Sequence, residues 1–163
     1  MKYWFLITIL VLQTNAWSHS EHKHESLDGK VITKVVSNRN QQVYVEINNA
    51  YLKEVKALFK KSCFNCHSSE INYPWYYKVP GVKQLIDHDT REAKKHLDFS
   101  KDFPFLGHGK PLKDLQSISK QLTEGKMPPL RYAIMHRDES LTDVEVQIIQ
   151  NWIKSSIEKL NNE

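Results

Sequence analysis

Apolar residues recur at helical spacing along most of the chain beyond residue 48. The first stripe consists of residues at i, i+1, i+4, i+7 and i+8, namely Tyr51, Leu52, Val55, Leu58 and Phe59. Asn48 or Asn49 can cap this helix, because an Asn side-chain oxygen accepts from backbone N–H groups that the first turn leaves free. The pattern predicts an amphipathic helix that runs directly into Cys63.

Three more helices are expected farther along the chain. Pro111 suits the first turn of one of them and Gly125 its end. Thr142, followed three residues later by Glu145, forms a capping box at the start of the last one. The apolar stripes of the three helices are Val82, Leu85, Ile86 and Ala93; Leu112, Leu115, Ile118 and Leu122; and Val144, Ile148, Ile149, Trp152, Ile157 and Leu160.

The segment from residue 31 to residue 47 has a different composition. Val31–Val36 and Val43–Ile47 are rich in Val, Ile, Thr and Tyr, which favour strands, and a polar stretch separates them. These features predict a short β-hairpin, which would have to pack on the rest of the domain because two strands alone are marginally stable. The expected fold is therefore mainly α, with residues 31–47 as a hairpin extension and residues 48–163 as a helical domain.

The N-terminus has the layout of a secretory signal peptide over residues 1–16. Lys2 precedes an apolar run that ends at Leu12, and small and polar residues follow up to Ala16. The rival interpretation is an uncleaved anchor, but a run of about ten apolar residues is half of what a spanning helix needs. We therefore expect a periplasmic or secreted protein without a stable membrane anchor.

Residues 17–30 are expected to form a polar linker. Segments of this kind near a chain end are commonly disordered. Its histidines could also bind a metal loosely, since His-rich tracts do so; they are His19, His22 and His24.

Composition and charge limit the functions open to the chain. With 163 residues, of which 40% are hydrophobic, it suits one compact domain and an extension. The net charge of +4 comes from basic residues spread along the chain, without the basic runs and interleaved aromatics that follow a phosphate backbone. We expect no nucleic-acid binding, whereas docking onto an acidic redox partner protein stays open.

The candidate chemistry lies in Cys63-Phe64-Asn65-Cys66-His67, which contains the two cysteines of the chain. A CxxCH sequence is the attachment pattern of c-type haem. Cysteines three residues apart on a helical turn present both sulfurs on one side, where they can bond the two vinyl groups of one haem. The adjoining histidine then reaches the iron as an axial ligand. The sequence predicts one covalent haem c on Cys63 and Cys66, with iron bound by His67.

Three alternatives to haem use the same residues. A thioredoxin-like CxxC needs a neighbouring βαβ pattern, which the sequence lacks. A zinc site could use Cys63, Cys66 and two histidines, but no second CxxC or HxxxH pair supplies the other ligands. A disulfide between the two cysteines would close a very small loop and constrain little of the unfolded chain.

The second axial ligand decides whether such a haem carries electrons or has an open face for chemistry. Met127 is the preferred ligand, because Pro128 and Pro129 stiffen the backbone that would aim its thioether. The alternative is that Met127 only fills the core. His136, on the same stretch, is the main competing ligand, and the remaining candidates are His88, His96, His108 and Met135.

The order of these features resembles class I cytochromes c over roughly residues 48–160. A closer resemblance is to the bacterial haem-binding domain family, whose members look like this chain at five segments: Cys63–His67, Tyr73–Tyr76, Asp98–Ser100, Met127–Pro128 and Leu141–Asp143. This resemblance implies a cytochrome c-like helical domain around one covalent haem, and says little about a substrate. The class I resemblance also implies that Phe59 and Val55 pack against Trp152.

Two more residues are expected beside the haem. By analogy with class I cytochromes, the carbonyl of Pro80 would accept from the free ring nitrogen of His67, although an ordinary turn beside Gly81 explains Pro80 equally well. Trp75 belongs to an aromatic cluster that either walls the haem or packs in the core; the cluster is Tyr73, Trp75, Tyr76 and Tyr77. Lys126 and Arg131 could pair with haem propionates or be solvated.

Two functions remain open at this point. The favoured one is an exported one-electron carrier with His67 and Met127 as axial ligands. The alternative is a haem enzyme or a gas or redox sensor with an open or displaceable distal side, for example a peroxidase-like module. Asp87, His88 or Asp89 could act as a distal acid or base, but their spacing singles out none of them.

Overall fold

The computed structural model describes residues 27–107 and 109–162, with side chains from residue 39 onward. The described chain is mainly α-helical, as the sequence predicts. Its longer helices are α1 (Leu27–Ala50), α4 (Val82–His96), α5 (Pro111–Thr123) and α7 (Asp143–Asn161). The shorter elements are η1 (Tyr51–Val55), α2 (Lys56–Ser62), α3 (Phe64–His67), η2 (Trp75–Lys78), β1 (Leu97–Asp98), β2 (Leu106–Gly107), α6 (Leu130–Met135) and η3 (Arg137–Glu139).

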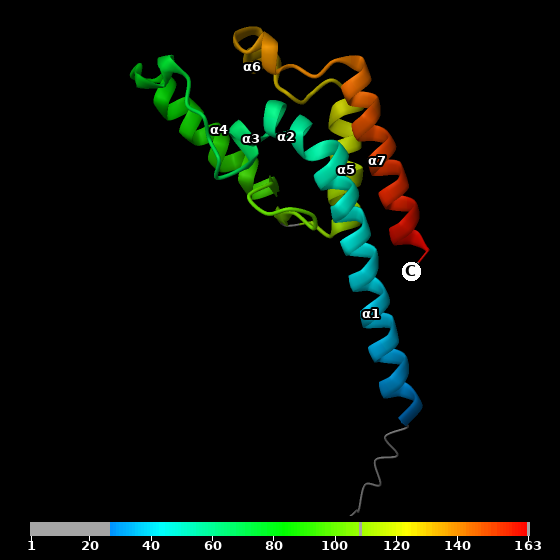
Figure 1. The fold of residues 1–163 in the computed structure, drawn as a ribbon. Helices are drawn as coiled ribbons and strands as arrows, with labels where there is room; N and C mark the ends of the chain where they lie inside the picture. Colours follow the sequence, from blue (N-terminus) through cyan, green and yellow to red (C-terminus); the bar gives the residue numbers. More distant parts are fainter. Residues whose placement is uncertain (1–26, 108, 163) are drawn as a thin grey trace, which may run out of the picture.

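One helical run leads from the N-terminal side of the domain to the CxxCH sequence. It consists of α1, the π-helical turn η1 and α2, and Figure 1 shows the first half of α1 extending beyond the rest of the molecule. Its buried stripe continues the predicted one by a turn, because Ile47 joins Tyr51, Val55 and Phe59 at successive four-residue intervals.

The predicted hairpin is wrong, because residues 31–47 lie within α1. The Val- and Tyr-rich segment of α1 meets the core as a helix: Ile47 is fully buried, and the Trp152 indole N–H donates to the Ile47 carbonyl at 3.4 Å. Tertiary packing therefore overrides the strand preference of β-branched residues, which costs a helix little at each position. The expected boundary between residues 47 and 48 falls inside the helical run.

The core lies where η1 and α2 meet α7. Phe59 and Trp152 pack edge to face, with ring centroids 6.2 Å apart, and Val55 is fully buried beside them, as the class I resemblance implies. Phe105 and Phe103 add rings from the loop between β1 and α5. α5 packs along the other side of α7, where the Ser119 hydroxyl donates to Gln150 at 2.6 Å.

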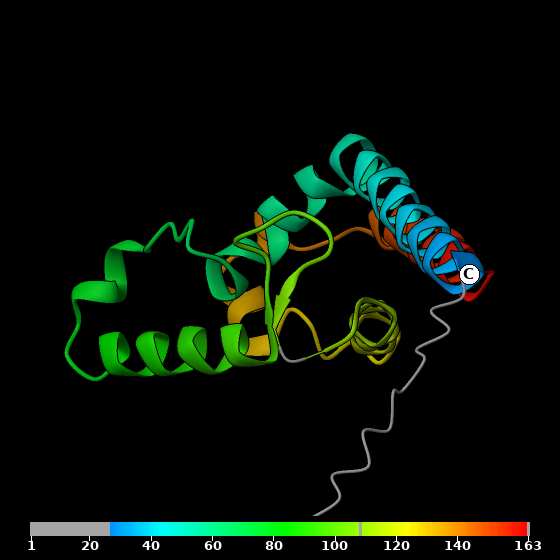
Figure 2. The same ribbon diagram turned by 90° about the horizontal axis from the view of Figure 1, so that it is seen from below.

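A second group of elements packs around α4. Figure 2 shows α4 at one end of the molecule, with α1 and α7 at the other. β1 pairs with β2 antiparallel directly after α4, so Leu97 stands opposite Gly107. α3 packs against α4, which brings the CxxCH sequence between this group and the α7 core.

The predicted ends of the later helices agree with the structure, but the predicted cap at Asn48 or Asn49 is wrong. Both residues lie inside α1, and the side-chain oxygen of Asn48 accepts no hydrogen bond from the described residues. The Thr142 hydroxyl accepts from the Glu145 N–H, and Glu145 accepts in turn from the Thr142 N–H, so the capping box forms. Gly125 follows α5 with a φ of 63°, a conformation that glycine adopts at no steric cost. Four residues predicted on the apolar stripes are instead exposed: Leu52, Leu85, Val144 and Ile148.

Several expectations concern the chain before residue 27. The signal peptide over residues 1–16 and the His19, His22 and His24 tract lie outside the described residues. Of the expected linker over 17–30, residues from Leu27 onward belong to α1. Within the described residues, no helix combines the length and apolar character required to cross a bilayer.

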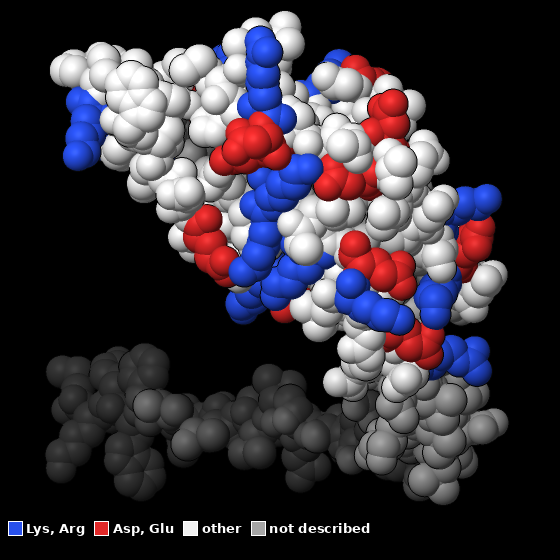
Figure 3. Space-filling view, turned by 45° about the horizontal axis from the view of Figure 1, so that its top comes forward, with Lys and Arg blue, Asp and Glu red and all other residues white. Residues whose placement is uncertain are grey.

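Charged side chains of both signs are interleaved on the molecular surface. In Figure 3, Lys and Arg side chains alternate with Asp and Glu across the visible face. Many of them pair, as Lys159 does with Glu46 at 2.6 Å and Lys56 with Asp102 at 2.7 Å. Such exposed pairs contribute little to stability individually.

Candidate haem site

The two cysteines and His67 lie on consecutive helical turns. α2 ends at Ser62, where the Cys63 N–H still donates to the Phe59 carbonyl at 2.8 Å. The backbone then bends at Cys63 and α3 begins, with the His67 N–H donating to the Cys63 carbonyl at 3.0 Å. Cys63, Cys66 and His67 are thereby held on one short piece of helix, and Phe64 anchors that piece in the core.

The side chain of His67 is oriented by the segment that follows α4. Its Nδ1 lies 2.8 Å from the Leu97 carbonyl oxygen, so the neutral ring donates from Nδ1 and keeps the lone pair on Nε2. The Phe99 N–H donates to the His67 backbone carbonyl at 2.6 Å, and the Phe99 ring lies 5.5 Å from the imidazole. Burial is the main cause that lowers the pKa of His67, with backbone hydrogen bonding opposing it. A neutral imidazole with a free Nε2 is the form that binds iron.

The acceptor for His67 is thus the Leu97 carbonyl, in place of the predicted Pro80 carbonyl. The physical reason lies in the position of α4. α3 packs on α4, so the chain that leaves the C-terminal end of α4 passes His67, whereas Pro80 is exposed in the turn before α4 begins.

Both thiols are free and half-buried. Burial raises the pKa of Cys63 to about 12, with the neighbouring Cys66 adding to the effect. Burial also raises the pKa of Cys66, and the carboxylate of Asp89 adds to this shift. Near neutral pH both sulfurs are therefore protonated thiols in the folded haem-free chain.

A polar network ties α6 and η3 to the CxxCH sequence. The Asn65 amide donates to the Tyr132 hydroxyl at 2.9 Å and to Glu139 Oε2 at 3.2 Å, and the Tyr132 hydroxyl also donates to Glu139. His136 stacks on the Tyr132 ring with centroids 4.2 Å apart. Its Nε2 lies 2.6 Å from the Tyr76 hydroxyl and its Nδ1 lies 3.3 Å from Glu139. Both ring nitrogens of His136 therefore have protein partners.

The other candidates for the distal ligand have fewer contacts. Met127 lies between α5 and α6 with 40% of its surface exposed, and Met135 is more exposed. His88 and His96 are exposed on α4. His108 lies outside the described residues.

The aromatic cluster after the motif divides into two parts. Tyr73 and Tyr77 stack with centroids 4.0 Å apart, and the Tyr77 hydroxyl donates to Asp87 at 2.7 Å. Tyr76 reaches His136, whereas Trp75 is 82% exposed and contacts the Tyr76 ring edge to face. Trp75 thus lies outside the protein core. The prediction that it packs beside the haem stays open.

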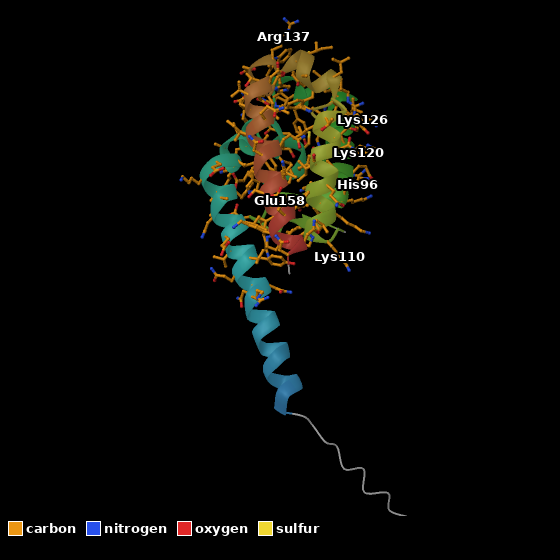
Figure 4. All side chains as sticks on the ribbon, turned by 90° about the vertical axis from the view of Figure 1, so that its right-hand side faces the viewer. His96, Lys110, Lys120, Lys126, Arg137 and Glu158 are labelled. Carbon is orange, nitrogen blue, oxygen red and sulfur yellow. The ribbon has the colours of Figure 1, made fainter. Side chains whose placement is uncertain are left out.

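The two cations expected near the propionates have protein partners. Lys126 pairs with Glu124 at 2.7 Å near the end of α5, and Arg131 pairs with Asp89 across α6 and α4. Figure 4 shows Lys126 beside the upper end of α5, and Arg137 farther up. Both pairs are exposed enough to be rearranged at little cost.

The residues of this region fit a covalent haem. Two thiols on one turn and an imidazole with Nε2 free form the donor set that a c-type haem uses. Helices α4 and α6 and the segments before them also expose large apolar side chains, as a site for an apolar cofactor requires; these are Val79, Leu85, Met127, Leu130 and Ile134.

Sequence reasoning missed several residues of the site. Phe99 could have been found, since Asp98–Ser100 is one of the segments that carry the family resemblance. Asn65, Tyr132 and Glu139 gave no signal, because their network joins residues more than 60 positions apart. A backbone acceptor such as the Leu97 carbonyl carries no sequence signature at all.

The fold and the site together define a mainly α protein with a c-type haem-attachment motif. A family model described as "Haem-binding domain" matches residues 14–155, so the chain belongs to the haem-binding domain family. The chain is also similar to the cytochrome c peroxidase Ccp of Escherichia coli (strain K12), with 30% identity over 149 residues. That match covers 90% of this chain and 29% of the relative, so the chain spans less than a third of the relative's length. No solved structure matches the chain at a significant level.

Proposed function

We propose that this chain is an exported c-type cytochrome that carries one covalent haem and transfers single electrons. Cys63 and Cys66 would hold the haem by thioether bonds, and His67 and Met127 would be the axial ligands. When bound, the haem supplies a one-electron Fe(III)/Fe(II) couple, and the protein sets its ligation and exposure. Membership of the haem-binding domain family supports the cofactor, and the signal-like residues 1–16 support export.

The observation that carries the proposal is the hydrogen bond from His67 Nδ1 to the Leu97 carbonyl. It fixes the ring tautomer and increases the basicity of Nε2. The Phe99 N–H holds the backbone of the same residue, so the imidazole needs little rearrangement to bind iron. A ligand that does not move between oxidation states suits rapid electron exchange.

Met127 remains the preferred distal ligand because it would lose fewer contacts than His136 on binding iron. Both ring nitrogens of His136 contact protein groups, so iron binding by His136 would break a hydrogen bond with Tyr76 or the contact with Glu139. Met127 is partly exposed on the loop before α6, and its weakly accepting thioether gives up little when it binds iron.

The decisive experiment is spectroscopy of the full chain made in a host that attaches haem c. We expect a covalent haem with a low-spin spectrum and a methionine-type signature that disappears in Met127→Ala. His136→Ala is the matched variant and should keep the signature. Loss of the signature in His136→Ala alone would assign the distal position to His136. A colourless chain with free thiols would overturn the proposal.

The proposed partner is a separate redox protein with an acidic docking surface, in keeping with the net charge of +4. We propose no nucleic-acid partner. Electron exchange with such a partner should slow as ionic strength rises, because salt screens the attraction between the two surfaces. An exchange rate independent of salt would contradict this part of the proposal.

A second function is favoured by the similarity to a protein named cytochrome c peroxidase. In that case the distal side would be open or displaceable, and the chain would be part of a haem enzyme or sensor. Carbon monoxide distinguishes the two, since it should bind the reduced protein rapidly if the distal side is open and slowly or not at all if Met127 is a firm ligand.

A further inference from the structure

A groove of about 580 Å³ lies on α4, away from the polar network around His136. One wall is the face of α4 that carries Thr90, Arg91 and Lys94. Ile71 and Tyr73 also line the groove, together with Asp98, Leu106 and Gly107 of the β1–β2 pair. Its volume is within the range of small-molecule sites.

The positive charges in the groove are incompletely matched. Arg91 and Lys95 both approach Glu92, at 3.7 and 2.7 Å. Lys94 is half-buried and has no ion pair with any residue whose side chain is described. Two cations thus share one carboxylate on this stretch of α4, and Lys94 is left without an ion pair among the described side chains.

The two carboxylates that line the groove are already engaged elsewhere. Asp87 accepts from the Tyr77 hydroxyl at 2.7 Å and from Lys83 at 2.6 Å, and these hydrogen bonds lower its pKa. Asp98 accepts from the Ser100 N–H at 2.8 Å. Asp87 is neutralised by Lys83, whereas Asp98 keeps its charge because its donors are neutral. Glu92 and Asp98 are then the two carboxylates facing Arg91, Lys94 and Lys95, so the groove keeps one positive charge in surplus.

A second, independent observation concerns Thr90. The residue lines the groove and is 6% exposed, and its hydroxyl oxygen is buried with no hydrogen-bond partner among the described residues. Buried hydroxyls without partners are rare because water no longer compensates them. Thr90 and Lys94 are four residues apart on α4, so the hydroxyl and the ammonium lie on the same face.

The remaining lining is apolar. Leu106 is 38% exposed and Tyr73 is 45% exposed, and both lie in the groove with Ile71. Exposed apolar side chains beside a hydroxyl and a cation match a ligand with a charged end and a short hydrocarbon part.

We propose that this groove binds a small organic carboxylate, whose anionic end pairs with Lys94 and, after the Thr90 side chain turns toward the groove, with its hydroxyl. The apolar part of the ligand lies against Ile71, Tyr73 and Leu106. The groove is distinct from the haem-attachment residues, but it adjoins the strand that holds His67. Asp98 lines the groove and the preceding Leu97 carbonyl accepts from the imidazole. A bound carboxylate is therefore placed to change the hydrogen bond that orients His67.

Titration calorimetry of the full chain, loaded with haem, tests the binding at constant ionic strength. The probes are hexanoate, benzoate and inorganic phosphate. We expect one saturable site for hexanoate or benzoate, weakened about tenfold in Lys94→Met, since a charge-assisted hydrogen bond is lost. Lys120→Met, on the outer side of α5 (Figure 4), should bind as the parent does.

Thr90→Val provides a second variant that keeps the side-chain shape. It should weaken hexanoate binding several-fold while leaving the thermal stability unchanged or slightly higher, because the hydroxyl has no partner to lose. Absence of saturable binding by both carboxylates, or equal weakening in Lys120→Met, would overturn the proposal. Phosphate binding as tight as hexanoate binding would overturn the assignment of a carboxylate with an apolar part.

Discussion

The helical frame around Trp152 and the loops around His67 differ in how completely they bury their apolar side chains. In the frame, Tyr51, Phe59 and Trp152 form a closed set of ring contacts and are each at most 4% exposed. Beside these loops, Leu130 is 75% exposed and Ile134 is 55% exposed on α6, the short helix that Tyr132 ties to Asn65. The frame is thus a complete core in the haem-free chain, whereas the loops present apolar surface that a cofactor would cover.

The largest expected effect contrasts the two regions directly. Phe59→Ala should cost about 3–5 kcal/mol of unfolding free energy in the haem-free chain, because a buried ring is lost and a cavity remains. Leu130→Ala should stay within about 0.5 kcal/mol, as for an exposed position. Denaturant unfolding followed by circular dichroism measures both changes.

Haem loading sharpens this contrast. If the loops around His67 cover the cofactor, Leu130→Ala should become more destabilising in the loaded protein than in the haem-free chain. A cost that is the same in both forms would mean that Leu130 lies away from the haem.

A smaller effect is expected where the two regions are joined by polar contacts. Glu139→Ala should cost about 1–3 kcal/mol, since Asn65, Tyr132 and His136 all lose the same acceptor. Asp138→Ala is the matched control, being the exposed neighbour of Glu139, and should stay near zero. Equal costs for the two variants would show that the network does not hold α6 and η3 in place.

The next largest change in unfolding free energy is expected at the start of α7, the helix that follows the site loops and carries Trp152. Thr142→Ala should cost about 1 kcal/mol, because the first turn loses its side-chain acceptor. Ser155→Ala, at an exposed position of the same helix, controls for the change to alanine. Thermal unfolding with calorimetry measures the two variants, and a larger loss in Ser155→Ala would refute the role of the cap.

An effect of similar size per group is expected from the site thiols, as a pH dependence of the stability of the haem-free chain. The pKa of Cys63 is raised to about 12 and that of Cys66 is also raised, so the unfolded chain loses these protons first as pH increases. Stability is then fully present below the unfolded thiol pKa, near 8.5–9, and falls as pH rises toward 12. Between pH 8 and pH 9.5 we expect a loss of up to about 1 kcal/mol per thiol.

The double variant Cys63→Ser with Cys66→Ser is the control for this pH dependence. It should lose the alkaline decline, since serine does not titrate in this range. Denaturant midpoints measured from pH 7 to pH 10 compare the two chains, and identical curves would assign the decline to other groups.

The sequence predicted the frame well because its signal is local. The four-residue spacing of Tyr51, Val55 and Phe59 and the capping box at Thr142 describe interactions within one helix, and both are present. The periodicity did not show how many residues of each apolar stripe are buried. Val144 and Ile148 are exposed because α7 turns its other side toward α1 and α5.

The site was predicted only as far as its motif. CxxCH identified Cys63, Cys66 and His67, and the structure supplies what a motif lacks: the Leu97 carbonyl and the contacts of His136. These depend on how α4 and α6 pack on α3, which one-dimensional periodicity does not determine. The predicted hairpin was wrong for the same reason. Residues 31–47 are helical, and Ile47 extends the buried stripe of that helix through tertiary packing that the local sequence does not specify.

The π-helical turn Tyr51–Val55 preserves the direction in which the attachment motif faces. A turn of this kind holds one residue more than an α-helical turn, and successive α-helical residues are rotated by about 100°. Deleting the exposed Lys53 would therefore restore regular α-helical winding and leave Val55 and Phe59 on the buried face. The wide turn absorbs the extra residue, so the two sulfurs keep their direction relative to α1 with or without it.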